Sequence, residues 1–318
     1  MLWYTLTMNF RKEWFNDENF WKYYAPIIFD DKRWSEVGEV ADAVTRLAGL
    51  TLNEGKPSSE NNANPRALDL CCGMGRISAE LSRRGFSTTG VDLSPSLLET
   101  AKEDAAHENL DIEYVLSDAR LYKRPQFFDT AVCLYISFGY FENPADDLLV
   151  AKNVYESLKS GGSFIIETLG KEIAARDFTP GESFERAGYT VLTEYEVVNS
   201  WSALKNRWVL IPQDPKDLHE LAEQNELLEL RDPLERHDLA EYGGAKCGGT
   251  KCGGAKRGGA KCGGAIIEKI FMQRLYAASE LKELLLEAGF STVEIYGGWD
   301  ESAYDQNAES LIAVGRRK

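Results

Sequence analysis

The segment 67–76, with the sequence ALDLCCGMGR, constrains the fold of this chain more than any other. Short apolar residues around the acidic Asp69 predict a buried strand. Two closely spaced glycines, Gly73 and Gly75, predict a tight turn, and an amphipathic run after them begins a helix. Such a turn lets a ligand approach bare backbone and directs helix N–H groups toward it. The segment therefore predicts a site for a nucleotide-type cofactor.

Strand and helix patterns alternate from this segment onward, which predicts a parallel sheet with helices on both faces. Ser94 before Pro95 and Asn143 before Pro144 are typical of helix starts, and the pair Gly161-Gly162 is typical of a helix stop. Ser279 is expected to cap a helix over 280–288. A further helix is expected over about 75–84. The expected strands are 67–72, 87–91, 112–116, 130–136 and 163–167.

Two short strands are expected near the C-terminus, at 293–296 and about 310–314. The loop between them is too short for a crossover helix, which indicates an antiparallel pair at the sheet edge. The alternation stops between residues 171 and 275, where strands at 189–198, 208–211 and 266–275 follow one another without helices. This region predicts an antiparallel β insertion that covers the acceptor as a lid. It contains a five-residue Gly/Lys/Cys repeat at 243–265, which lacks bulky apolar side chains and is expected to be disordered.

The remaining boundaries follow from composition. Residues 1–52 are aromatic-rich and include a helical pattern at 37–47, so they predict either a helical cap packed on the core or an aromatic lid over a ligand. Residues 53–65 are predicted to be a surface linker. Residues 66–170 and 276–318 form the expected cofactor-binding domain, and residues 171–275 form the insertion.

Charge and cysteine usage exclude several classes of function. The 318-residue chain has a net charge of −15, and the repeat holds five basic and no acidic side chains, so the rest carries −20. Such a surface repels phosphate backbones, which disfavours nucleic-acid binding. The six cysteines form no CxxC pair, so we expect reduced thiols and no metal site. The absence of a membrane-length apolar run and of a signal-peptide pattern predicts a cytoplasmic protein.

Further acidic residues follow the next two strands. Asp92 ends the second strand and precedes Leu93, where a carboxylate can accept hydrogen bonds from ribose hydroxyls. Asp118 and Ala119 follow the third strand, where Asp118 can reach an adenine amino group. Asp69 suits the ammonium of a methionine moiety better than a pyrophosphate, and Ser78 occupies the last glycine position of GxGxxG. The pattern thus favours S-adenosylmethionine over a nicotinamide cofactor.

These motifs resemble those of class I S-adenosylmethionine-dependent methyltransferases. Residues 68–75 match the first motif of that family, 90–94 the second, and 117–119 and 128–141 the later ones. The resemblance implies a Rossmann-like α/β fold whose seven-stranded sheet is mostly parallel with an antiparallel last strand. It also implies that the cofactor is bound at Asp69, Gly73, Gly75, Asp92, Leu93, Asp118 and Ala119.

Within that superfamily, the segment 133–138 is similar to small-molecule N-methyltransferases of the glycine type. By this resemblance Leu134 and Ser137 line the methionine end of the cofactor. The chain departs from those enzymes at Ile136, where they carry Asn. Arg76 is expected either to contact the cofactor carboxylate or to be an exposed first-turn residue.

The expected activity is methyl transfer to a small molecule by in-line displacement, for which positioning and desolvation suffice and no general base is assigned. A protein or RNA methyltransferase, a nicotinamide oxidoreductase and a non-catalytic S-adenosylmethionine-binding module are the alternatives. The oligomeric state is left open. Substrate contacts are expected from aromatic and basic residues, for each of which core packing or a surface ion pair is an equal alternative: Tyr24, Arg207 and Trp208, together with Trp201, Trp299 and Tyr304.

Overall fold

A computed structural model of the chain describes residues 13–50, 64–214 and 266–318. Two compact units are distinguished: one comprises residues 1–180, 195–206 and 270–318, and the other 181–194 and 207–269. Most of the predicted linker, the acidic stretch at 220–235 and the repeat at 243–265 lie outside the described residues. Within the described ranges, no helix is both long enough and apolar enough to span a membrane.

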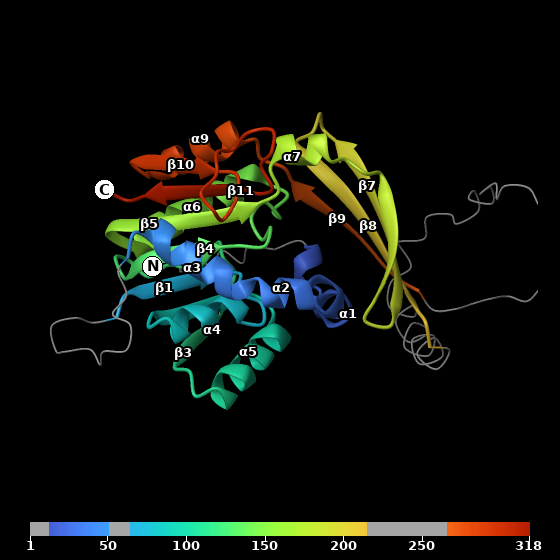
Figure 1. The fold of residues 1–318 in the computed structure, drawn as a ribbon, viewed down its shortest axis with the longest axis horizontal. Coiled ribbons are helices and arrows are strands. Elements are labelled where there is room, and N and C mark those ends of the chain that lie inside the picture. Colours follow the sequence, from blue (N-terminus) through green and yellow to red (C-terminus); the bar gives the residue numbers. More distant parts are fainter. Residues whose placement is uncertain (1–12, 51–63, 215–265) are drawn as a thin grey trace, which may run out of the picture. The chain divides into compact units, whose positions relative to one another are not determined.

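The first unit starts with helices and continues with alternating strands and helices (Figure 1). Its N-terminal elements are η1 (Trp14–Asn16), α1 (Glu18–Ile28), α2 (Asp31–Ser35) and α3 (Val37–Ala48). The alternating part consists of β1 (Arg66–Leu70), α4 (Arg76–Arg83), β2 (Ser87–Asp92), α5 (Pro95–His107), β3 (Ile112–Leu116), β4 (Phe128–Cys133), α6 (Pro144–Ser157), β5 (Leu158–Thr168) and α7 (Lys171–Arg176). It ends with α9 (Ala278–Ala288), β10 (Thr292–Tyr296) and β11 (Leu311–Arg316).

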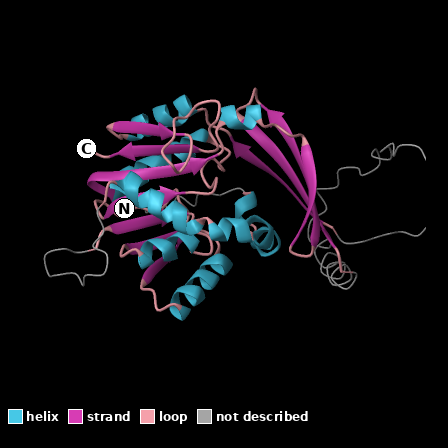
Figure 2. Cartoon of the chain, viewed as in Figure 1, coloured by secondary structure: helices cyan, strands magenta, loops and turns pink. Residues whose placement is uncertain are grey.

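The main sheet has seven strands in the order β10-β11-β5-β4-β1-β2-β3 (Figure 2). Strands β1 to β5 pair in parallel, whereas β11 pairs antiparallel with both β5 and β10. The chain order reverses beside β1, where the sheet continues through β2 on one side and β4 on the other. The predicted sheet, including its antiparallel last strand, is confirmed.

Helices bury the central strands of this sheet on both faces, and successive strand residues contribute to opposite layers. Leu68 on β1 and Phe164 on β5 belong to the layer with α6 and α9. Their neighbours Ala67 and Ile165 belong to the layer with α3 and α4. This alternation explains why the central strands read as short, almost continuous apolar runs.

The structure confirms the predicted capping residues of α5 and α6. Ser94 accepts a hydrogen bond from the Leu97 N–H at the start of α5, and Asn143 accepts one from the Ala145 N–H at the start of α6. Both helices carry proline in their first turn, where its missing N–H costs nothing.

Two other predicted helix boundaries were wrong. The pair Gly161-Gly162 does not stop α6, which ends at Ser157, but lies in an irregular part of β5 where the pairing with β4 shifts register. Gly161 adopts a φ of 80°, which a bulge in a strand requires. Ser279 is not the cap of α9, because the Glu280 carboxylate accepts the Ala277 N–H at 2.8 Å instead.

The predicted insertion is a four-stranded antiparallel sheet in the order β6-β7-β8-β9. Its strands are β6 (Gly181–Arg186), β7 (Tyr189–Val198), β8 (Ala203–Pro212) and β9 (Ile267–Arg274). Strand β7 has the predicted bounds, and β8 is longer than expected. Strand β6 was missed because most of its side chains are exposed on both faces, which leaves no apolar alternation to detect.

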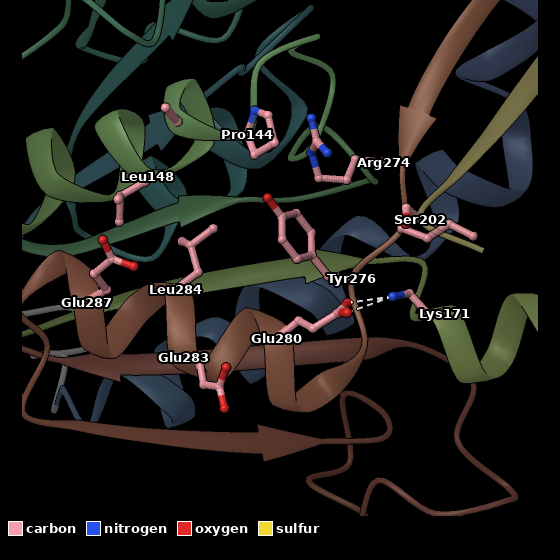
Figure 3. A pocket seen from close by; sticks show the side chains of 12 residues that line it. Pro144, Leu148, Lys171, Ser202, Arg274, Tyr276, Glu280, Glu283, Leu284 and Glu287 are labelled. Atoms are coloured by element: carbon pink, nitrogen blue, oxygen red, sulfur yellow. Dashed lines mark hydrogen bonds and ion pairs between the residues drawn. The ribbon is translucent and has the colours of Figure 1, made fainter. Parts of the chain in front are cut away.

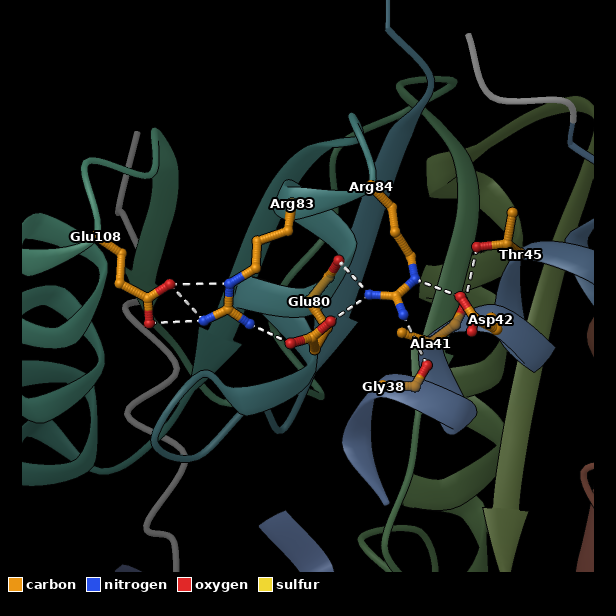
Figure 4. Close-up of polar contacts among 8 residues, drawn as sticks. All are labelled: Gly38, Ala41, Asp42, Thr45, Glu80, Arg83, Arg84 and Glu108. Carbon is orange, nitrogen blue, oxygen red and sulfur yellow. Dashed lines mark hydrogen bonds and ion pairs between the residues drawn. The ribbon is translucent and has the colours of Figure 1, made fainter. Parts of the chain in front are cut away.

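Arg84, the residue after α4, attaches α3 to α4 (Figure 4). The Arg84 Nε donates to the Asp42 carboxylate at 2.7 Å, and its Nη2 donates to the Gly38 carbonyl at 2.8 Å. Arg84 also forms an ion pair with Glu80 on α4. These bonds fix α3 beside the helix that follows the glycine turn.

We expect Arg84→Met to lower the free energy of unfolding by about 1–2 kcal/mol, because Glu80 and the Gly38 carbonyl lose a charged donor. Urea denaturation measures this change. Lys123→Met is the matched control, since Lys123 forms an exposed ion pair with Glu156 and should cost less than about 0.5 kcal/mol. Equal losses in the two variants would contradict the role given to Arg84.

Candidate cofactor site

The glycine turn lies at the carboxyl end of β1 and has a left-handed backbone. The φ angles of Cys71, Gly73 and Gly75 are 61°, 54° and 74°. Such angles favour glycine, so the two glycines are required by the turn itself. A Cβ at Gly75 would also overlap the hydroxyl of Tyr114. The turn therefore depends on glycine for its φ angles and, at Gly75, for the close approach of Tyr114.

Asp92 holds this turn against the end of β2. One carboxylate oxygen accepts the Gly73 N–H at 2.7 Å, and the other accepts the Ser94 N–H at 2.9 Å. Burial raises the pKa of Asp92, while the backbone N–H groups oppose that shift. The carboxylate is half-buried, and Leu93 beside it is likewise partly exposed. Asp92 thus has the position predicted for a ribose-binding acid.

Asp69 is buried beneath the turn, at 3% exposure. The Ser78 hydroxyl donates to its carboxylate at 2.6 Å. Burial raises the pKa of Asp69 to about 7, and the hydrogen bonds from Ser78 only partly oppose this shift. Ser78 therefore binds the carboxyl group of Asp69 on the preceding strand. Its place in the GxGxxG pattern did not predict this role.

Asp118 follows β3 and belongs to a cluster of charges. Its carboxylate accepts the Arg120 backbone N–H at 2.8 Å and the Arg120 Nη2 at 2.6 Å. Arg120 is buried and also pairs with Glu13 and Asp146. Ala119 is half-buried against the core. The contact of Asp118 with adenine stays a prediction.

Strand β4 ends sooner than predicted because the chain turns after Leu134. Tyr135 and Ile136 have φ angles of 55° and 63°, which non-glycine residues rarely adopt. Glu167 on β5 holds this turn, since its carboxylate accepts the Tyr135 N–H at 2.7 Å. Leu134 is buried and Ser137 half-buried, with the Ser137 N–H bonded to the Leu134 carbonyl. Strained backbone of this kind often marks functional sites.

The N-terminal helices bond to residues that follow β1, β2 and β3. The Glu18 carboxylate accepts the Ser94 and Ser96 hydroxyls, the latter at 2.6 Å. Glu13 pairs with Arg120 at 2.7 Å, beyond the end of β3. Arg76, the first residue of α4, bonds to α2. We call residues 13–35 the cap.

Both parts of the aromatic N-terminus make packing contacts, and its predicted role as a lid over a ligand stays a prediction. Helix α3 packs in the core layer beside α4, as a structural helix would. Within the cap, Tyr24 is 1% exposed and stacks on Phe20, so the structure gives it a packing role. Trp14 packs against Tyr140 and Phe271, with ring centroids 4.8 and 4.6 Å apart.

The other predicted substrate residues contact protein groups in the structure, and their roles toward a substrate stay predictions. Arg207 on β8 pairs with Glu194 and Glu268, which is the surface ion-pair alternative. Trp208 is half-buried on the same strand. The remaining aromatics contact other groups: Trp201 packs on Phe178, Trp299 on the layer of α3, and the Tyr304 hydroxyl donates to Glu172.

Arg76 has two alternative predicted roles, a contact with the cofactor carboxylate and an exposed place in the first turn of α4. It is only 6% exposed, so the exposed first-turn alternative is wrong. Its guanidinium lies over the rings of Phe29, Trp34 and Tyr135. Burial lowers the pKa of Arg76.

Three cysteine thiols lie at or near the turn. Cys71, Cys72 and Cys133 form no disulfide. The pKa of the Cys71 thiol is raised by its contact with Cys133 and by burial, and burial raises that of Cys72. Among the residues with described positions, no group of three or more His, Cys, Asp or Glu is arranged to hold a metal ion.

A pocket of about 460 Å³ lies elsewhere, between α6, α9 and the end of β9 (Figure 3). Tyr276 stands in it, and the Lys171–Glu280 ion pair borders it. No residue predicted to bind the cofactor lines this pocket. The candidate cofactor site is therefore a separate place, at the carboxyl ends of β1, β2, β3 and β4.

Comparison with known families identifies the central segment. Residues 67–162 match the family model described as a methyltransferase domain. The ubiquinone biosynthesis O-methyltransferase of Coxiella burnetii is 34% identical over 113 residues, which are 35% of this chain and 47% of that protein. The mitochondrial enzyme of the same name from Schizosaccharomyces pombe is 31% identical over 117 residues, 36% of this chain and 41% of that protein. The chain thus spans about half the length of the curated relatives it matches.

Solved structures share the fold over nearly the whole chain at low identity. An S-adenosylmethionine-dependent methyltransferase from Clostridium acetobutylicum has a TM-score of 0.63 at 14% identity, covering 94% of this chain and 98% of its own. The sugar N-methyltransferase KedS8 from Streptoalloteichus has a TM-score of 0.58 at 16% identity, covering 91% and 90%. Residues 67–162 are therefore similar to methyltransferase domains, and the comparisons do not single out the glycine-type branch.

The raised pKa of Asp69 predicts a particular pH dependence of stability. The folded pKa of about 7 exceeds the ordinary 3.8, so the unfolded chain binds fewer protons between these values. Stability must therefore fall as pH rises through this window. We expect Asp69→Asn to reduce the fall in unfolding free energy between pH 5 and pH 8 by on the order of 2 kcal/mol.

Urea denaturation at several pH values measures this slope. Asp147, whose pKa burial raises to about 6, should contribute a remaining decline of the same sign. The exposed Asp111 supplies the control, since Asp111→Asn should leave the slope unchanged. A slope in Asp69→Asn equal to that of the unaltered chain would refute the assignment.

Proposed function

We propose that the protein transfers a methyl group from S-adenosylmethionine to a small-molecule acceptor. The observation that carries this proposal is the Asp92 carboxylate bonded to the glycine turn inside the methyltransferase domain. This places a hydrogen-bond acceptor beside bare backbone at the carboxyl ends of two neighbouring strands. Open α/β sheets bind nucleotide-like ligands at such edges.

The residues at this edge fit the parts of that molecule. Asp92 would accept hydrogen bonds from the ribose hydroxyls, and Asp118 from the adenine amino group. Leu93 and Ala119 are half-buried and offer apolar contacts beside the adenine. The turn at 134–137 follows β4 and would line the methionine end. Gly73 and Gly75 allow the left-handed turn that brings the backbone against the Asp92 carboxylate.

Electrostatics also favour this cofactor. Asp69 lies beneath the turn, and its negative charge would be unfavourable beside a pyrophosphate. The same charge favours a bound cation, and S-adenosylmethionine carries an ammonium and a sulfonium. When bound, it supplies a methyl group already activated for displacement. The chain then has to orient the acceptor and exclude water, which contributes to the rate without a proton-transfer group.

No histidine in the described part of the chain lies at this edge. His107 is exposed in the last turn of α5. We therefore assign no general base and leave the acceptor atom open. A base is needed only where the acceptor must lose its proton early.

The relatives support a small acceptor. Their names describe methylation of ubiquinone precursors and of sugars. CalS10 from Micromonospora echinaspora, an amino pentose methyltransferase solved with S-adenosylmethionine bound, has a TM-score of 0.55 at 16% identity, covering 93% of this chain and 97% of its own. The charge of −20 outside the repeat argues against nucleic acid as acceptor. Cytoplasmic location remains part of the proposal.

Binding of S-adenosylhomocysteine tests the cofactor site. Asp92→Asn should weaken binding by about 1–3 kcal/mol, because an amide cannot accept all the hydrogen bonds of the carboxylate. Isothermal titration calorimetry measures this loss, with Asp111→Asn as the control. Unchanged affinity in Asp92→Asn would remove Asp92 from the site.

A second assay distinguishes an enzyme from a binding module. We expect the protein to transfer a labelled methyl group from S-adenosylmethionine to the small-molecule fraction of a cell extract, which is assayed beside the macromolecular fraction of the same extract. Label that appears only in the macromolecular fraction would contradict the small-molecule proposal. Binding without transfer to either fraction would favour a non-catalytic module.

A further inference from the structure

Arg76 carries a buried positive charge that has no anionic partner among the described side chains. Its side chain is 6% exposed, and in the described ranges it forms no ion pair. Its one hydrogen bond there runs from Nη1 to the Arg33 carbonyl at 2.9 Å. A buried cation is costly unless an anion and further hydrogen bonds compensate it.

Three aromatic rings surround this charge. The Arg76 guanidinium carbon lies 4.9 Å from the ring centre of Phe29, 5.4 Å from that of Trp34 and 4.6 Å from that of Tyr135. Ring faces attract a guanidinium, yet such contacts leave most of its N–H donors unused. Arg76 is therefore held in place and still has donors to offer.

A second cation and an unused hydroxyl lie at the same place. The guanidinium carbon of Arg33 is 5.7 Å from the ring centre of Tyr135, so two arginines face one ring. The Tyr135 hydroxyl is buried and has no hydrogen-bond partner among the described groups. Arg33 likewise forms no ion pair within the described residues. Two like charges beside an unpartnered hydroxyl indicate that an anion is missing.

The nearest acidic side chains, Asp69 and Asp30, are not the missing anion. The Asp69 carboxylate is bonded to Ser78, and its proximity to Arg76 is only a minor influence on the pKa of either group. Asp30 caps α2 by accepting the Arg33 backbone N–H. Neither acid forms a salt bridge with Arg76.

The location connects this cluster with the proposed cofactor site. Arg76 directly follows Gly75, and Tyr135 directly follows Leu134 at the end of β4. The Phe29 ring contacts Arg76 and also lies 3.4 Å from where a Cβ on Gly73 would be. The unpaired donors thus border the glycine turn on the side of β4.

We infer that Arg76 and the Tyr135 hydroxyl bind the α-carboxylate of the methionine moiety of the cofactor. The inference rests on the proposed function, and it gives the cap a role in recognising the cofactor. A planar guanidinium suits a carboxylate, because it donates two parallel hydrogen bonds. Arg33 adds positive charge at the same place. The competing explanation is that Arg76 only fastens α2 through the Arg33 carbonyl.

Two probes that differ at the carboxylate separate these explanations. S-Adenosylhomocysteine carries the amino-acid group, whereas 5′-methylthioadenosine keeps the adenosine and the thioether but lacks it. We expect Arg76→Met to weaken S-adenosylhomocysteine binding at least 20-fold in calorimetry. The same variant should bind 5′-methylthioadenosine within about twofold of the unaltered chain, which also reports that the site is folded.

Conservative variants supply the matched controls. Tyr135→Phe keeps the ring and removes the hydroxyl, so it should weaken S-adenosylhomocysteine binding several-fold without changing 5′-methylthioadenosine binding. Arg76→Lys should lie between Arg76→Met and the unaltered chain. Equal losses for both probes in Arg76→Met would establish the structural explanation and overturn the inference, as would unchanged S-adenosylhomocysteine affinity. Failure of the unaltered chain to bind either probe would overturn the proposed function itself.

Discussion

The hydrogen bond from the Gly73 N–H to the Asp92 carboxylate is the interaction on which the site depends. It joins the residue after β1 to the last residue of β2, at 2.7 Å. The second oxygen of the same carboxylate binds the Ser94 N–H and so fixes the start of α5. One side chain therefore sets the turn, the end of a strand and the beginning of a helix. The left-handed backbone of Gly73 and Gly75 makes this arrangement accessible to glycine and to few other residues.

Charges around this bond are poorly compensated, which is typical of functional sites. Asp69 is buried with a pKa of about 7, and Arg76 is buried without an anion among the described residues. Each arrangement costs stability in the unliganded chain. A zwitterionic ligand with an ammonium and a carboxylate would compensate both charges at once. The same features that lower the stability of the chain thus favour the methionine moiety of the proposed cofactor.

Local sequence signals predicted the sheet and most of its helices because they act through neighbouring residues. Ser94 and Asn143 cap their helices by reaching N–H groups two or three residues away. The local signals failed where tertiary contacts determine the secondary structure. The Gly161 pair looks like a helix stop, yet the register between β4 and β5 makes it a strand irregularity. Strand β6 is exposed on both faces and has no periodicity to read.

The places of Asp92 and Asp118 at or just after the ends of strands were predictable from the local pattern, whereas their contacts with the cofactor stay predictions. The site was not predictable where partners come from distant segments. The burial of Arg76 depends on Phe29 and Trp34, more than 40 residues earlier in the chain. The pairing of Arg120 with Glu13 crosses 107 positions. Arg207 forms the surface ion pairs that were one of its two predicted roles, with partners on the adjacent strands β7 and β9.

A crystal structure of the full chain with S-adenosylhomocysteine tests the central claim most directly. The account predicts ribose hydroxyls within hydrogen-bonding distance of the Asp92 carboxylate, adenosine beside Leu93 and Ala119, and the thioether near Leu134 and Ser137. Density for the ligand in the pocket between α6 and α9, or an edge of the sheet left empty at saturating ligand, would contradict it.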